Sequence, residues 1–157
     1  MRALAGLALV AIVTAVALAT PVPMLAVTDG VTSRAVWLDD GERYRYTYLS
    51  PIGQVAVEER HLRSNDRLRI TSVRSSDVRA IEAFRWEGAP RRTGEVWEQD
   101  APSNRARRIT IQLTPGSLQR LSGDRWTIDL GAFSERTVGI SADRLPIFTA
   151  LTRGWRP

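Results

Sequence analysis

The sequence predicts an all-β fold, an antiparallel β-sandwich or barrel of about seven to nine strands behind an N-terminal apolar helix. Apolar and polar residues alternate in several short stretches after residue 28, with the period of two that half-buried strands show. Turn residues such as Gly, Pro and Asn separate these stretches at roughly 8–12-residue intervals. No long stretch after residue 28 has the period of an amphipathic helix. Residues 29–157 are therefore expected to form a single β domain.

The clearest strand signal is a set of three tyrosines within residues 42–48. Tyr44, Tyr46 and Tyr48 alternate with Arg and Thr, so they share one face of a strand. Tyr and Thr also favour strands because their side chains pack well on a pleated surface. The remaining expected strands lie at residues 54–61, 67–73, 109–114, 118–121, 126–130 and 138–140.

Three segments have less regular patterns. Residues 78–86 are expected to form a strand, although their alternation is poor. Residues 87–107 are rich in Gly, Pro and Arg and are expected to form a long loop with one short strand around Val96 and Trp97. Residues 145–151 are apolar and are expected to form a short helix.

The first 28 residues carry no charge between Arg2 and Asp29. One interpretation is a cleavable signal peptide with an apolar core at residues 3–16. Small residues then occupy the positions that precede cleavage, in Ala15-Val16-Ala17 or in Ala17-Leu18-Ala19.

The other interpretation is an uncleaved membrane anchor. Residues 3–19 together with residues 24–27 supply the roughly 20 apolar residues that a spanning helix needs. In both cases residues 1–28 are the leader, and residues 29–157 lie outside the cytoplasm. The protein is then either secreted or anchored in the cytoplasmic membrane, with membrane contact through residues 1–28 if they stay attached. The sequence leaves this choice open.

The composition excludes several classes of chemistry. The chain has no cysteine, which excludes disulfides, a lipid-attachment cysteine, a thiolate metal site and a cysteine nucleophile. All 22 basic residues are arginine and the formal net charge is +5. Because acidic residues lie among the arginines, we expect a solvated surface of mixed charge, with affinity for anionic surfaces as the alternative. No nucleic-acid recognition motif occurs, so nucleic acid is not an expected partner.

The single histidine, His61, limits the catalytic possibilities. A Ser-His-Asp site would need it, but the chain has no Gly-x-Ser-x-Gly motif. On a strand, His61 shares a face with Glu59, whereas Glu58 points the other way. One His and one Glu are too few ligands for a zinc site. We therefore expect no catalytic residue, no metal and no cofactor, and a hydrolase that uses His61 with Glu59 is the weaker alternative.

Adjacent carboxylates occur at Asp39 and Asp40, before Gly41. Neighbouring residues of a strand face opposite sides, so this pair does not form a glycosidase dyad by itself. The tripeptide is instead typical of a turn that precedes the tyrosine strand.

The tyrosine face has two interpretations. Aromatic side chains bury a large area, so Tyr44, Tyr46 and Tyr48 are expected to pack in the core. Alternatively, they line a concave surface that binds a small or lipid-like ligand.

A family resemblance begins at the tyrosine strand. The run from Tyr44 to Leu62, with the following Leu-Arg-Ile, resembles family 1850 of the domains of unknown function. The members of that family are small exported proteins with an apolar N-terminal segment and a β-rich body. Ser50 and Glu58 match the serine and the glutamate of the family motif, whereas Leu49 stands at its histidine.

The resemblance also implies a partner, since many members are encoded beside TRAP transporters of the TAXI type. The expected function is that of a non-enzymatic, exported or membrane-anchored β-domain. It would act as an accessory or binding module at the cell envelope, with a membrane transporter or another envelope component as partner. The alternative is a β-barrel that binds a small molecule or a lipid. The candidate ligand-binding residues are Tyr44, Tyr46, Tyr48, Ser50 and Glu58.

Overall fold

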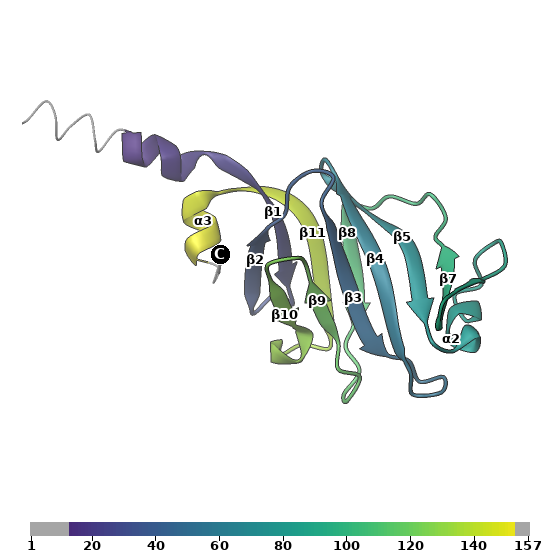
Figure 1. The fold of residues 1–157 in the computed structure, drawn as a ribbon. Coiled ribbons are helices and arrows are strands. Elements are labelled where there is room, and N and C mark those ends of the chain that lie inside the picture. Colours follow the sequence, from purple (N-terminus) through teal and green to yellow (C-terminus); the bar gives the residue numbers. More distant parts are fainter. Residues whose placement is uncertain (1–12, 153–157) are drawn as a thin grey trace, which may run out of the picture.

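Two antiparallel sheets pack face to face in the computed structural model of the protein, which describes residues 13–152 (side chains to residue 149; Figure 1). The smaller sheet has four strands in the order β2-β1-β11-β8. Their bounds are Ser33–Trp37 for β2, Pro21–Thr28 for β1, Thr137–Pro146 for β11 and Arg108–Gln112 for β8. Strand β8 is an edge of this sheet.

The larger sheet has seven strands in the order β10-β9-β3-β4-β5-β7-β6. Their bounds are Thr127–Asp129 for β10, Arg120–Ser122 for β9, Arg43–Leu49 for β3, Ala56–Ser64 for β4, Arg67–Ser75 for β5, Val96–Asp100 for β7 and Arg91–Thr93 for β6. The helical elements are short: residues 13–19, α2 (Val78–Glu82), the 3₁₀ turn η1 (Leu130–Ala132) and α3 (Ile147–Thr152).

The all-β antiparallel sandwich predicted from the sequence is confirmed. The described residues contain eleven strands rather than seven to nine. The additional strands arise because β1 and β2 lie where the sequence showed no alternation, and because part of the expected loop at residues 87–107 forms the β6–β7 hairpin. The expected short helix near residues 145–151 is confirmed as α3.

The division of the chain after residue 28 is wrong as a description of the fold, because residues 21–28 form β1. This strand lies between β2 and β11, and Leu25 and Val27 have no solvent exposure. Met24 is also buried, on the opposite face, where β1 packs against Leu145 and Ile147. A strand that is buried on both faces has a continuous apolar sequence, which is why it resembled part of a leader.

The position of β1 shortens the segment that can serve as a signal peptide or a membrane anchor. Residues 24–27 belong to the β domain, so an anchor is left with residues 3–19, and both cleavage motifs precede the start of β1. Residues 1–12 lie outside the described part of the chain. Within residues 13–152, no helix combines the length and the apolar character that crossing a membrane requires.

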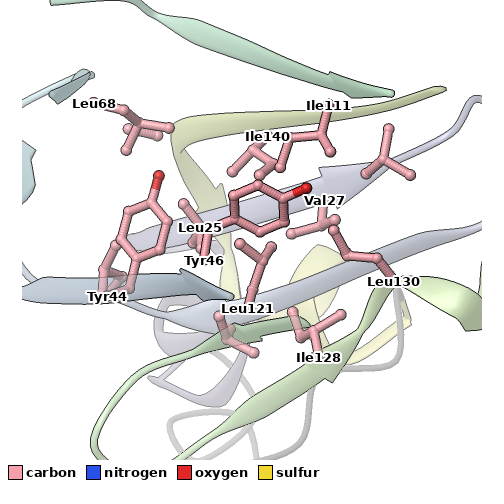
Figure 2. Packing of buried hydrophobic residues seen from close by; sticks show 14 of the residues in the cluster. Leu25, Val27, Tyr44, Tyr46, Leu68, Ile111, Leu121, Ile128, Leu130 and Ile140 are labelled. Atoms are coloured by element: carbon pink, nitrogen blue, oxygen red, sulfur yellow. The ribbon is translucent and has the colours of Figure 1, made fainter. Parts of the chain in front are cut away.

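The main core lies between the two sheets and includes the tyrosine strand. Figure 2 shows Tyr44 and Tyr46 among aliphatic side chains that come from both sheets. Leu25 and Val27 contribute from β1, and Ile140 contributes from β11. The packing interpretation of these two tyrosines is therefore supported by their exposed fractions of 1% and 6%.

Residues 78–86 do not form the expected strand. The side chain of Asp77 accepts a hydrogen bond from the Arg79 backbone N–H at 2.9 Å and caps α2. Ala80 and Ile81 of this helix are buried against β4 and β5 residues Val57 and Val73. A capped turn of helix with two buried apolar residues explains the poor alternation.

Asp29 joins the β1–β2 turn to the loop that precedes β11. One carboxylate oxygen accepts hydrogen bonds from the backbone N–H groups of Val31 and Thr32, and the other from those of Ser134 and Glu135. Desolvation opposes ionisation of this carboxyl group, but the four hydrogen bonds outweigh it and lower its pKa from 3.8 to about 2.

We expect the substitution Asp29→Asn to destabilise the protein in a pH-dependent way. Because the pKa is depressed in the folded state, the carboxylate's stabilisation is fully present above about pH 4 and is lost as the pH falls through about 2. Urea unfolding of both proteins between pH 7 and pH 2 measures this difference. A difference that stays constant over the whole range would contradict the assignment.

Candidate functional site

A cleft of about 590 Å³ opens between edge strand β8 and the inner face of the larger sheet. The smaller sheet ends at β8, whereas the larger sheet continues from β4 through β5 to β7 and β6. Among residues 13–152, no strand of the smaller sheet therefore lies opposite the inner face of the larger sheet beyond β8. This difference in width between the two sheets creates the cleft.

The walls of the cleft are mostly apolar and aromatic. Ile109 and Ile111 line it from β8, and Ile70 lines it from β5. Phe84 and Trp86, which follow α2, form another wall, and their ring centroids lie 4.8 Å apart. A smaller hollow of about 170 Å³ shares Ile70, Trp86 and Ile109 with the cleft. The volume of the cleft, though not that of the smaller hollow, lies in the range of small-molecule sites, about 300–1,000 Å³.

Two of the three predicted tyrosines line this cleft. The hydroxyl of Tyr46 accepts a hydrogen bond of 2.7 Å from Gln119 Nε2 at the cleft wall. Gln119 also donates to the Gln112 carbonyl and accepts from the Thr114 N–H, so it fixes the loop beside β8. Burial raises the pKa of Tyr46 to about 12, although the Gln119 hydrogen bond opposes this shift.

Tyr48 is the more accessible of the two cleft tyrosines and connects two clusters of apolar side chains. It packs against the main core and against the cluster of Val57, Val73 and Ile81 beneath α2. Its ring stacks on that of Tyr46 with centroids 4.9 Å apart. Burial raises the pKa of Tyr48, and the negative charge of Glu59 raises it further.

The third tyrosine, Tyr44, lies in the core and does not line the cleft. Its ring stacks on His61 with centroids 4.7 Å apart. Burial, followed by the charge of Glu59, raises its pKa. Tyr44 is thus not positioned to contact a ligand in this cleft, and its role in ligand binding stays a prediction.

Glu59 is the charged residue of the cleft. It lies on the inner face of β4, opposite Tyr46 in the register with β3, and its side chain is 12% exposed. Its Oε2 lies 3.3 Å from Nε2 of His61, which is 1% exposed. The predicted shared face of Glu59 and His61 is thus confirmed.

The Glu59–His61 pair does not have the geometry of a hydrolase site. His61 is enclosed behind Tyr44 and is not among the residues that line the cleft. A general base must come within hydrogen-bond reach of a substrate, and the buried ring has no such access. Within residues 13–149, no group of three or more His, Asp or Glu side chains is arranged to hold a metal ion.

The structure separates the two remaining candidates, Ser50 and Glu58, from the cleft. Ser50 is buried and its Oγ accepts a hydrogen bond from the Ile52 N–H, which stabilises the turn after β3. Glu58 lies on the outer face of β4 and pairs with Arg60 at 2.9 Å and with Arg74 at 3.9 Å. Neither residue lines the cleft, and a role of either in ligand binding stays a prediction.

Sequence reasoning missed most of the cleft walls. Trp86 and Phe84 lay in a segment expected to be a strand, and Ile109 and Gln119 lie far from the tyrosines in the chain. Besides Tyr46 and Tyr48, Glu59 carried a usable signal, because its alternation with Glu58 placed it on the inner face.

Comparisons of the chain with protein-family models, with curated proteins and with solved structures find no match. The resemblance to family 1850 of the domains of unknown function therefore stays a prediction from the residues of the tyrosine strand.

Proposed function

We propose that the protein is a non-enzymatic binding module that holds a small, largely apolar ligand in the cleft between β8 and the larger sheet. The observation that carries this proposal is the composition of the cleft. Aromatic and aliphatic side chains form most of its walls, and a few polar groups project among them. Ligand sites in proteins commonly have this combination, in which apolar walls supply affinity and polar groups fix orientation.

The surroundings of His61 and Glu59 favour binding over catalysis. His61 is enclosed in the core, where its ring stacks on that of Tyr44. Its partner Glu59 lines the cleft, but the described residues there do not place a nucleophile beside it in a known catalytic arrangement. The hydrolase alternative is therefore not the function that the geometry supports best.

The place of action is part of the same proposal. The uncharged residues 3–19 before β1 support export or anchoring of the β domain at the cell envelope. An association with a TRAP-type transporter stays a prediction from the family resemblance.

Removal of the Trp86 indole tests the proposed site. We expect Nile red, a neutral apolar dye, to bind the protein, and Trp86→Ala to weaken this binding about tenfold because the ring forms a wall of both hollows. Dye fluorescence in a titration gives the affinity.

Trp37→Ala is the matched control. Trp37 lies in β2 of the smaller sheet and is 39% exposed, and it does not line the cleft. The control variant should bind the dye as the original protein does. Failure of the dye to bind, or equal loss of affinity in both variants, would contradict the proposal.

A further inference from the structure

Among the described residues, Glu59 is the one charged side chain that lines the cleft, although Arg105 lines the smaller adjoining hollow and the protein as a whole has a net charge of +5. Apart from Arg63, which is buried on the inner face of β4 and donates to backbone carbonyls, the arginines of β3, β4 and β5 alternate onto the outer face. Arg60 and Arg74 form ion pairs there with Glu58 and Glu98. The cleft therefore has a local charge opposite to that of the whole protein.

No arginine neutralises the Glu59 carboxylate within the described part of the chain. The recorded ion-pair contact of Glu59 is with His61, at 3.3 Å. The carboxylate also lies near the hydroxyl of Tyr48, whose pKa is raised by burial and by the charge of Glu59. The carboxylate is 12% exposed and lacks a guanidinium partner. Because a mostly buried charge is costly without a partner, this site favours binding of a ligand that carries a cationic group.

The remaining walls suit the body of such a ligand. Four aromatic side chains line the cleft: Tyr46, Tyr48, Phe84 and Trp86. Aromatic rings attract organic cations through their π-electrons, most strongly where water is excluded. Ile70, Ile109 and Ile111 provide aliphatic surface for a hydrocarbon chain.

We infer that the cleft binds an apolar organic cation, an amine whose ammonium group lies against Glu59 and whose hydrocarbon body lies between β8 and Trp86. This inference rests on the proposed function and adds to it the chemical class of the ligand. A fatty acid of the same length would bring a second carboxylate close to Glu59, and the repulsion between like charges disfavours it.

Three probes with the same hydrocarbon chain test the charge preference: decylamine, decanol and decanoate, each titrated calorimetrically below its micelle concentration at pH 7. Decylamine should bind about tenfold more tightly than decanol, and decanoate should bind most weakly. Glu59→Gln keeps the shape of the side chain and should reduce decylamine affinity about tenfold, to the level of decanol.

Two controls make the result specific. Glu58→Gln changes the adjacent carboxylate on the outer face and should leave all three affinities unchanged. Decanol affinity should be the same in Glu59→Gln as in the original protein, which shows that the cleft has kept its shape.

If decanol or decanoate binds as tightly as decylamine, or if Glu59→Gln binds decylamine normally, the cation inference fails and the apolar site stands. If none of the three probes binds, both the inference and the proposed function fail.

Discussion

A chain that begins at residue 29 is expected not to fold, whereas a chain that begins at residue 20 is expected to fold fully. The shorter chain lacks β1, which pairs with β11 along its whole length and also with β2. Without β1, strand β2 has no partner, because the order of the sheet is β2-β1-β11-β8. The main core also loses Leu25 and Val27, which are fully buried.

The free energy of folding that is lost with this strand should exceed the total stability of a typical domain, about 5–15 kcal/mol. Far-UV circular dichroism and thermal unfolding of both chains measure the outcome. The chain from residue 20 should give a β spectrum and a cooperative transition, and the chain from residue 29 should give neither. A cooperative transition in the shorter chain would show that β1 is dispensable, contrary to its central position.

Arg63→Ala is expected to destabilise the protein by about 3–5 kcal/mol. Arg63 is 2% exposed at the end of β4. Its Nη1 donates to the carbonyls of Met24 and Leu38, and its Nη2 donates to that of Asp143. The guanidinium therefore ties the larger sheet to β1 and β11 of the smaller sheet.

Removal of the guanidinium leaves these carbonyls without their donors, and each buried unsatisfied group costs about 1–3 kcal/mol. Arg63→Lys keeps the charge but presents one nitrogen instead of a planar fork, so it should have an intermediate effect. Arg60→Ala is the control, since an exposed ion pair contributes less than about 1 kcal/mol. Urea unfolding gives the free energies, and equal values for Arg63→Ala and Arg60→Ala would contradict the role assigned to Arg63.

The burial of Arg63 also corrects the expectation that the arginines lie on a solvated surface. The spread of arginines among acidic residues predicted a solvated surface, which holds for Arg60 and Arg74 but not for Arg63. Arg63 and His61 both lie on the inner face of β4, but alternation alone does not show which face carries a charge that is satisfied internally. Backbone carbonyls from distant strands provide the partners of Arg63, and these appear only in the tertiary structure.

Local pattern was sufficient for β3, where the alternation of tyrosines predicted both the strand and its buried face. The same reasoning failed for β1, because both of its faces are buried, and for α2, whose cap residue Asp77 was not considered. The cleft depends on the different widths of the two sheets, and strand order cannot be derived from alternation. Tyr46 and Tyr48 could therefore be proposed as ligand contacts, but not Trp86 or Ile109, which line the same cleft.

Location of bound Nile red by crystallography tests most directly whether the cleft is the binding site. The dye should lie between β8 and the inner face of the larger sheet, in contact with Trp86 and close to Tyr48 and Glu59. Electron density for the dye at another surface, with the cleft left empty, would contradict the account.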